Sequence, residues 1–177
     1  MRWLLGVGII LTLPTMLVAK EADQDAAIVR AALAATGRAA CQDPDRAAGP
    51  FAALRSERAR DARREELTWF HEKLFRMWES LDGAAWLEGP IVERLAAASA
   101  RLLAGPTGPE TRGDTPDLDQ PGPCNGLIVS GVEWMDGIAF VEVGERRGGR
   151  DGNGMLWAFE WGGTRWVPLA KQMTWVM

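Results

Sequence analysis

The sequence is poor in the nitrogen and sulfur ligands that bind zinc, with one histidine, His71, and two cysteines, Cys41 and Cys124. The cysteines are too far apart for a local metal motif, and a structural zinc site needs about four nitrogen or sulfur ligands. The sequence also lacks a nucleophile elbow and a phosphate-binding loop. We therefore expect no metal, no cofactor and no identifiable catalytic residue, and interpret His71 as an ordinary helix-surface or half-buried side chain.

Lysine and net positive charge are also scarce. Lys and Arg together number 20 against 24 Asp and Glu, and the formal net charge is −4. The lysines are Lys20, Lys73 and Lys171. Non-specific nucleic-acid binding depends on neutralising phosphates, so this mild acidity argues against a nucleic-acid partner.

Long apolar runs are limited to the N-terminus. Arg2 precedes an apolar stretch over residues 3–18, which is followed by the small Ala19 and the charged Lys20. This order is typical of a secretory signal peptide, so we expect cleavage after Ala19 and a periplasmic or secreted protein. The alternative is an uncleaved membrane anchor. A spanning helix needs about 20 apolar residues, whereas this run is shorter and contains Pro14.

Residues 1–19 are thus the expected signal peptide, and residues 20–177 are expected to form a single domain. Because the removed segment contains Arg2 as its one charged side chain, the formal charge changes from −4 to −5. Contact with a membrane is expected only if the N-terminal segment is retained.

Helical patterns occupy the first part of this domain. An apolar stripe predicts a helix over residues 21–40, and an amphipathic pattern predicts another that begins at Pro90 and reaches Gly105. The longest pattern predicts a helix over residues 51–81, with apolar residues at helical spacing in its second half: Leu67, Phe70, Leu74, Met77, Trp78 and Leu81. Residues 106–126 are rich in Pro, Gly, Thr and Asp and predict a long, mobile, irregular loop.

The last third of the sequence alternates between apolar runs and turn residues. Four strands are predicted, over residues 127–135, 138–145, 155–161 and 164–176. Asp136-Gly137 and Gly162-Gly163 separate consecutive strands and favour tight hairpins. Pro168 has no amide hydrogen and therefore indicates a sheet edge or a bulge. The expected fold is α+β, with N-terminal helices packed on a C-terminal four-stranded antiparallel meander.

The first hairpin places two carboxylates on one face of the sheet. A two-residue turn fixes the register, which pairs Met135 with Ile138 and Glu133 with Phe140. Glu133 and Glu142 then become diagonal neighbours, about 7–8 Å apart at Cα. Such a pair can act as general acid and base, but we interpret both as residues of a solvated face. The opposite face carries Val132, Trp134, Ala139, Val141 and Val143.

The second hairpin gathers aromatic side chains on one face of the sheet. The same two-residue rule predicts three cross-strand pairs: Phe159 with Trp166, Trp157 with Pro168, and Glu160 with Arg165 as an ion pair. The resulting aromatic face contains Trp157, Phe159, Trp161 and Trp166. We expect the helical segments 67–81 and 91–103 to cover it as core. The alternative is a pocket or groove that binds an apolar ligand.

Two further features are interpreted structurally. In an oxidising compartment, the even cysteine count predicts a disulfide between Cys41 and Cys124. Residues 151–154, Asp-Gly-Asn-Gly, resemble the start of a calcium loop, but Met155 occupies the position of the next oxygen ligand. We therefore expect a Gly-rich hairpin connection over residues 147–154.

The closing stretch FEWGGTRWVPLAKQMTWV, residues 159–176, resembles the last hairpin of domains similar to nuclear transport factor two. The order of helices followed by a strand meander is also similar. The resemblance implies a curved sheet and N-terminal helices around a conical pocket, in a superfamily of isomerases, dehydratases, ligand binders and non-catalytic exported domains. This chain lacks a short hairpin between its helices and has a long loop over residues 106–126. No catalytic residue of that superfamily maps onto it.

Three functions are compatible with these features. The first, which we expect, is an exported non-catalytic domain that binds a small apolar ligand or a peptide at the aromatic face. The second is a protein-interaction role, such as an inhibitor or immunity-type partner, which fits the acidic charge and the charges of both signs over residues 55–66 of the predicted helix. The third is an enzyme with acid–base groups, Glu133 or His71, inside a cone-shaped pocket.

Overall fold

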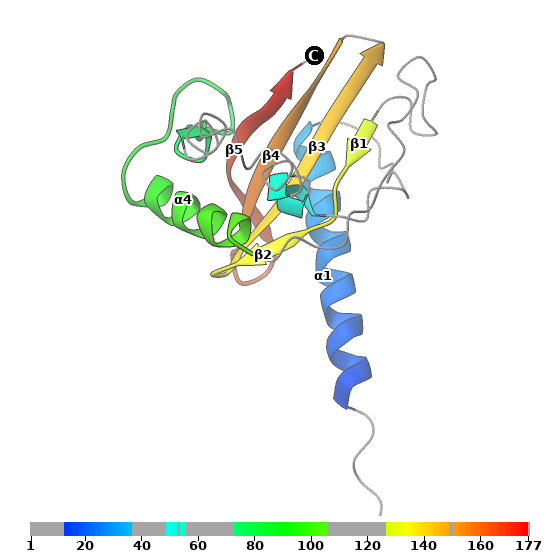
Figure 1. The fold of residues 1–177 in the computed structure, drawn as a ribbon. Coiled ribbons are helices and arrows are strands. Elements are labelled where there is room, and N and C mark those ends of the chain that lie inside the picture. The colour runs from blue at the N-terminus through cyan, green and yellow to red at the C-terminus, as the bar shows by residue number, and fades with distance from the viewer. Residues whose placement is uncertain are drawn as a thin grey trace, which may run out of the picture.

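The computed structural model in Figure 1 describes residues 13–36, 49–52, 54–55, 73–105, 127–148 and 151–176. Helix α1 (Leu13–Thr36) is followed by helix α4 (Pro90–Leu103). Five strands come next: β1 (Leu127–Val129), β2 (Glu133–Met135), β3 (Ile138–Gly148), β4 (Asp151–Trp161) and β5 (Trp166–Val176). Helices precede an antiparallel sheet, which confirms the α+β prediction. Cys41, Cys124, His71 and the loop over residues 106–126 lie outside the described residues.

The sheet is a meander whose first strand is interrupted. β1 and β2 both pair with β3, and the order across the sheet is β1-β3-β4-β5. At the interruption, the Ser130 hydroxyl accepts a hydrogen bond from the Glu142 amide at 2.8 Å, and the Ser130 amide donates to the Glu142 carbonyl at 3.0 Å. β1 and β2 together therefore occupy the place of the strand predicted over residues 127–135, which preserves the four-stranded arrangement.

The turn between β2 and β3 has the predicted geometry. Asp136 and Gly137 both have positive φ, 54° and 78°, as a two-residue turn that matches the twist of its strands requires. The register pairs Met135 with Ile138, and it places Glu133 opposite Phe140, as predicted.

The turn between β4 and β5 is longer than predicted, and the three predicted pairs are wrong. The Gly162 amide donates to the Arg165 carbonyl at 2.9 Å, so four residues connect the strands. The observed pairs are Trp161 with Trp166, Phe159 with Pro168, Trp157 with Lys171, and Glu160 with Val167. The predicted Glu160–Arg165 ion pair is replaced by one between Glu160 and Arg94 of α4, at 2.7 Å. Side chains alternate with a period of two, so the two-residue slip at the turn changes partners without changing faces.

Pro168 lies where a residue without an amide hydrogen can be accommodated. β5 is the outer strand of the sheet, and the β4–β5 register is irregular between Ala158 and Phe159, beside Pro168. The structure therefore confirms the prediction of an edge or a bulge at this proline.

The helix predicted over residues 51–81 does not extend to its last apolar residues. Residues 73–74 are helical, but Glu79 is bridged to Trp86 on one side and to Lys171 of β5 on the other. The Glu79 amide donates to the Lys171 carbonyl at 2.8 Å, and the Lys171 amide donates back to the Glu79 carbonyl at 3.3 Å. The outer edge of β5 thus supplies the backbone partners that a helix would otherwise supply.

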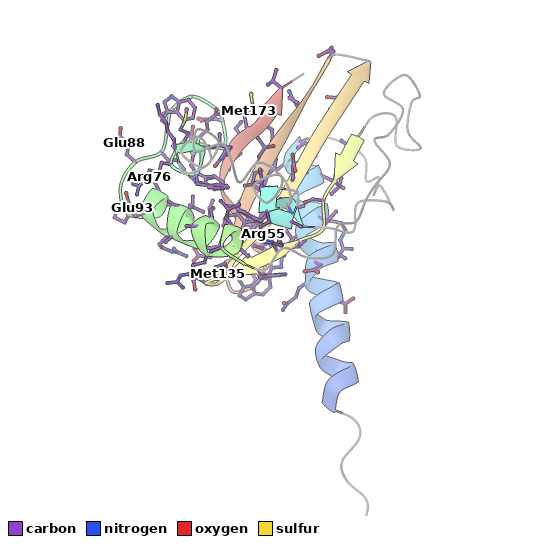
Figure 2. The ribbon with its side chains drawn as sticks, viewed as in Figure 1. Arg55, Arg76, Glu88, Glu93, Met135 and Met173 are labelled. Carbon is purple, nitrogen blue, oxygen red and sulfur yellow. The ribbon has the colours of Figure 1, made fainter. Side chains whose placement is uncertain are left out.

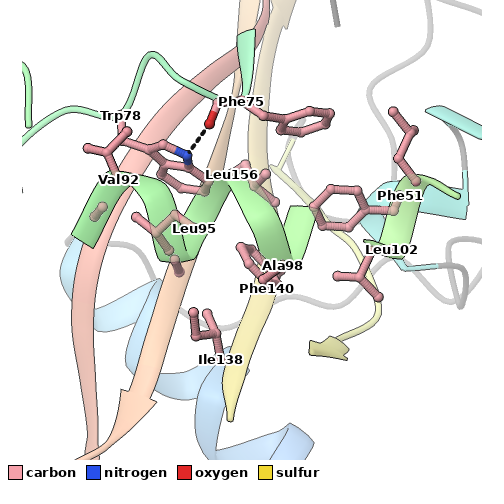
Figure 3. Close-up of a cluster of buried hydrophobic side chains, with 13 residues drawn as sticks. Phe51, Phe75, Trp78, Val92, Leu95, Ala98, Leu102, Ile138, Phe140 and Leu156 are labelled. Atoms are coloured by element: carbon pink, nitrogen blue, oxygen red, sulfur yellow. Dashed lines mark hydrogen bonds between the residues drawn. The ribbon is translucent and has the colours of Figure 1, made fainter. Parts of the chain in front are cut away.

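α4 covers one face of the sheet and begins at Pro90, as predicted. Its apolar side packs on the sheet together with Phe51, Phe75 and Trp78 (Figure 3). Trp78 is fully buried although it lies outside a helix, and its indole N–H donates to the Phe75 carbonyl at 2.9 Å. The largest buried partners from α4 and the sheet are Leu95, Leu102, Ile138, Phe140 and Leu156.

α1 covers the opposite face (Figure 1). Its buried residues are Ile28, Val29, Ala32 and Leu33, and they pack against Ala139, Val141, Val143, Trp157 and Phe159. The buried part of the aromatic face, Trp157 and Phe159, is therefore covered by α1, and the expectation that segments 67–81 and 91–103 cover it was wrong for the described residues 73–81 and 91–103. α4 covers the other face of the sheet, which carries Phe140 and Leu156. Residues 77–81 lie beside the edge of β5, where Glu79 pairs with Lys171.

α1 begins earlier than the helix predicted over residues 21–40. It starts at Leu13, with Pro14 in the first turn, where a proline is tolerated. The helix continues without a break through Ala19, and cleavage after this residue stays a prediction. Within the described residues, no helix combines the length and the apolar composition that crossing a membrane requires.

Candidate functional site

Glu133 is held in a partly buried ion pair. Its carboxylate accepts a hydrogen bond from an Arg55 guanidinium nitrogen at 2.9 Å and another from the Phe51 amide at 2.6 Å. The Glu133 side chain is 16% exposed. The interpretation of Glu133 as part of a solvated face was therefore wrong, because helical residues Phe51 and Arg55 contact it.

Arg55 joins three separate segments of the chain. Besides its ion pair with Glu133 of β2, it donates to the Leu102 carbonyl in the last turn of α4 at 2.7 Å. A cation at a helix C-terminus is favoured, since the helix dipole leaves partial negative charge on the last carbonyls. Figure 2 shows Arg55 in the interior between these elements, whereas Arg76 and Glu93 point outwards. Arg55 and Glu133 thus form a structural clamp.

Glu142, the second candidate acid–base residue, contacts a different part of the protein. Its carboxylate accepts a hydrogen bond from the Thr174 hydroxyl of β5 at 2.8 Å. Glu133 is neutralised by Arg55 at the β2 end of the same face. The described contacts therefore give the two carboxylates separate partners and do not build a shared acid–base site.

The aromatic face divides into a buried part and an exposed part. Trp157 and Phe159 are core residues, with rings stacked at a centroid distance of 6.4 Å, and Trp157 is only 5% exposed. The Lys171 ammonium lies 6.0 Å from the centre of the Trp157 ring, within the range of a cation–π contact. Trp161, by contrast, is 51% exposed, and Trp166 is half-buried.

Trp161 and Trp166 belong to a group of three tryptophans that we call the indole cluster, consisting of Trp134, Trp161 and Trp166. Trp166 lies between the other two, at ring-centroid distances of 4.9 Å from Trp134 and 5.3 Å from Trp161. The Trp134 indole N–H donates to the Asp25 carboxylate of α1 at 2.9 Å. Trp134 and Trp166 are thereby fixed in place, and Trp161 presents its indole to solvent against them.

The indole cluster lies where α1 leaves the sheet. Among residues 23–36 of α1, the buried ones all follow Asp25, and the first half of the helix extends past the end of the sheet that carries β2 and the β4–β5 turn (Figure 1). The cluster is therefore bordered by the sheet and contacts α1 at Asp25.

The sequence placed Trp157, Phe159, Trp161 and Trp166 on one face correctly but did not identify Trp134 as part of the same group. Trp134 was assigned to the face that carries Ala139, and Ala139 pairs with Phe159 in the structure. The β3–β4 register was the missing signal, since it connects the first hairpin to the second. Arg55 was also missed, because nothing local in the sequence indicates its contacts with Leu102 and Glu133.

Several buried polar atoms in the described part of the chain have no hydrogen-bond partner. The Gln172 side chain is fully buried and both its amide oxygen and its amide nitrogen are unpaired. The Ser99 hydroxyl of α4 and the Trp157 indole nitrogen are likewise unpaired. Gln172 pairs with Leu156 on the side of the sheet that α4 covers, whereas Trp157 lies on the side that α1 covers.

The described residues contain no group of three or more His, Cys, Asp or Glu side chains that could hold a metal ion. Asp151 and Asn153 lie in β4, where Asn153 pairs with Glu145 of β3. The Gly-rich connection predicted over residues 147–154 is therefore wrong, because both strands extend into it.

Asp82 lies in the turn that connects Glu79 to Trp86, beyond the edge of β5. Hydrogen bonds from the Ser80 hydroxyl and the Ala84 amide hold the pKa of its carboxyl below the ordinary value.

Comparison of the chain with protein-family models, with curated proteins and with solved structures finds no match to any of them.

Proposed function

We propose that this protein is an exported, non-catalytic domain that binds a small apolar ligand or a peptide through the indole cluster. The observation that carries the proposal is the state of Trp161, which is 51% exposed while it lies against Trp166. Large aromatic side chains left partly in water at a fixed position offer an apolar contact surface with little ordering cost.

The other contacts of the site support a binding role. Glu133 is neutralised by Arg55, and Glu142 is engaged by Thr174. These contacts engage both carboxylates within the fold, and both lie on the face of the sheet opposite to Trp134 of the indole cluster. The proposal therefore assigns the carboxylates to stability and the tryptophans to recognition.

Export and the sequence resemblance are parts of the same proposal. The order of Arg2, an apolar stretch over residues 3–18 and Ala19 supports a signal for export and a periplasmic or secreted location. An α+β order with a closing Trp-rich hairpin supports the likeness to nuclear-transport-factor-two-like domains. We also propose a Cys41–Cys124 disulfide, because an oxidising compartment favours disulfide formation.

The test compares two exposed tryptophans. Trp86 is 58% exposed and lies beyond the edge of β5, outside the indole cluster, which makes Trp86→Ala the matched control for Trp161→Ala. Binding of the apolar fluorophore anilinonaphthalene sulfonate to the folded domain is measured by titration. Trp161→Ala should weaken binding by about 1–2 kcal/mol, roughly 5–30-fold in Kd, whereas Trp86→Ala should leave the Kd unchanged. Equal effects of the two variants would contradict the proposal.

A protein-interaction role is the second candidate, and a separate surface favours it. Several large apolar side chains near the outer edge of β5 are exposed: Met77, Leu81, Trp86 and Met173. Exposed apolar residues that gather along a sheet edge are typical of protein contacts. If this surface carries the function, Trp86→Ala should abolish binding to a partner protein that Trp161→Ala leaves intact.

A further inference from the structure

The three rings of the indole cluster meet at steep angles. The planes of Trp134 and Trp166 are inclined at 68°, and those of Trp161 and Trp166 at 58°. In such contacts the edge of one ring covers at most one face of the other. The cluster is therefore not a closed stack of rings, and it leaves indole faces that its own members do not cover.

The face of an indole attracts cations. The π electrons give each ring a negative face and a positive edge, and tryptophan attracts cations more strongly than the other aromatic side chains do. The same domain contains one such contact, because the Lys171 ammonium lies 6.0 Å from the centre of the Trp157 ring. Several aromatic rings set at an angle are the usual way in which proteins bind quaternary ammonium groups.

Asp25 places a negative charge at the edge of the cluster. Its carboxylate accepts the hydrogen bond of the Trp134 indole N–H at 2.9 Å. This contact fixes the orientation of Trp134, and it polarises the indole so that the ring face becomes more negative. Asp23, two residues earlier on α1, is exposed and adds a second carboxylate about 3 Å away along the helix axis.

The other charged side chains described at this end of the domain do not cancel the charge of Asp25. Glu160 and Asp136 are each paired with an arginine of α4, at 2.7 Å and 2.8 Å. Arg165 in the β4–β5 turn and Arg30 of α1 are exposed, so water and salt screen their charges. Asp25 is half-buried and contacts the cluster directly, so its charge is the one that a ligand of the cluster meets.

We propose that the ligand of the indole cluster carries a trimethylammonium group, which contacts the indole faces beside Asp25. This inference rests on the proposed function of the cluster and names the chemical class of its ligand. The methyl groups of a trimethylammonium group are apolar and suit the exposed ring of Trp161, while its positive charge suits the ring faces and the carboxylate. A primary ammonium group is strongly hydrated and therefore loses more when it leaves water.

The experiment compares two ligands of nearly equal size and shape on the full chain. Choline carries the trimethylammonium group, and in its neutral isostere dimethylbutanol a carbon replaces the nitrogen. Each is titrated into isotope-labelled protein, and the indole N–H signals of the tryptophans report where it binds. Choline should bind about 5–30-fold more tightly than dimethylbutanol. The shifts should occur at the indole cluster and not at Trp86, which is 58% exposed and lies beyond the edge of β5.

A change of charge at Asp25 supplies the second measurement. Asp25→Asn keeps a side-chain oxygen that can accept the Trp134 indole N–H, but it removes the negative charge. Choline should bind this variant roughly 5-fold more weakly, and dimethylbutanol should keep its affinity. Asp23→Asn is the matched control, because it removes the same charge from an exposed position and should have a smaller effect. Equal losses for choline and dimethylbutanol in Asp25→Asn would overturn the recognition of charge.

The trimethylammonium group occurs both in small solutes and in the headgroup of phosphatidylcholine, and competition separates these sources. The Kd for choline is measured again with vesicles of phosphatidylcholine present. A raised apparent Kd assigns the headgroup as the ligand, and an unchanged Kd assigns a soluble compound. Vesicles of phosphatidylglycerol, which lacks the group, are the control. An equal rise with these vesicles would overturn recognition of the trimethylammonium group.

The outcomes distinguish this inference from the proposed function. Equal affinities for choline and dimethylbutanol would overturn the preference for a cation, and the proposed function would survive if both ligands shift the Trp161 signal. A preference for choline that Trp161→Ala removes and Trp86→Ala leaves intact supports both. Absence of a shift at Trp161 with either ligand, together with absence of anilinonaphthalene sulfonate binding there, would overturn both.

Discussion

At the scale of single residues, Arg55 connects parts of the chain that lie far apart in the sequence. Arg55 contacts Leu102, 47 positions away, and Glu133, 78 positions away. Gly49 belongs to the same arrangement, since a Cβ at this position would collide with the Glu133 side chain. One ion pair and its hydrogen bonds therefore connect the segment that begins at Gly49 with the last turn of α4 and with strand β2.

Removal of Glu133 should destabilise the domain strongly. Glu133→Ala leaves the Arg55 guanidinium largely buried without its counter-charge and the Phe51 amide without its acceptor, and such a loss costs about 3–5 kcal/mol. Urea denaturation followed by tryptophan emission measures the change in the free energy of unfolding. Glu93→Ala is the control, because the Arg76–Glu93 pair is well exposed and exposed pairs contribute about 1 kcal/mol or less. Similar costs for both variants would show that burial does not determine the strength of the Glu133 contact.

At the scale of elements, the sequence predicted what short-range geometry determines. The β2–β3 turn consists of Asp136 and Gly137, which both adopt positive φ, so the pairing of Glu133 with Phe140 follows from the turn alone. α4 was predicted for a similar reason, because Pro90 and a regular apolar stripe mark its start and its buried side.

The elements that were predicted incorrectly depend on contacts with the rest of the fold. Gly162-Gly163 is compatible with turns of different length, and the observed four-residue connection places Trp161 opposite Trp166. The apolar spacing over residues 67–81 is helical, yet Glu79 hydrogen-bonds to Lys171 at the edge of β5. The spacing of apolar residues cannot reveal that a distant strand, β5, binds the backbone of Glu79. It also could not show that α1, rather than a later helix, covers Trp157 and Phe159.

β4 provides a prediction that separates core from surface within one strand. Phe159 is fully buried beneath α1, so Phe159→Ala should cost about 3–5 kcal/mol of unfolding free energy. Trp161, two residues further on the same face, is half exposed, and Trp161→Ala should cost less than about 1.5 kcal/mol. Thermal and urea denaturation of the two variants tests this difference. A larger cost at Trp161 than at Phe159 would mean that the indole cluster is part of the core and would weaken its assignment as a binding surface.

At the scale of the whole molecule, the sheet separates two apolar cores. Phe140 and Leu156 face α4, whereas Ala139 and Trp157, their neighbours along the same strands, face α1. Side chains alternate between the two faces along each strand, so the apolar residues of the sheet are divided between α1 and α4. The indole cluster lies on the α1 side, so a loss of α1 packing should affect it more than a loss of α4 packing.

This architecture predicts that the two cores contribute independently to stability. Leu33→Ala removes a buried side chain between α1 and the sheet, and Leu95→Ala removes one between α4 and the sheet. Each should cost about 2–5 kcal/mol. Because the sheet lies between the two sites, the double variant should lose the sum of both within about 0.5 kcal/mol, as distant sites without shared partners usually do. A double-mutant cycle by urea denaturation measures the coupling. A coupling energy above about 1 kcal/mol would show that one core transmits its packing to the other through the strands, and anilinonaphthalene sulfonate binding at Trp161 should then respond to Leu95→Ala as strongly as to Leu33→Ala.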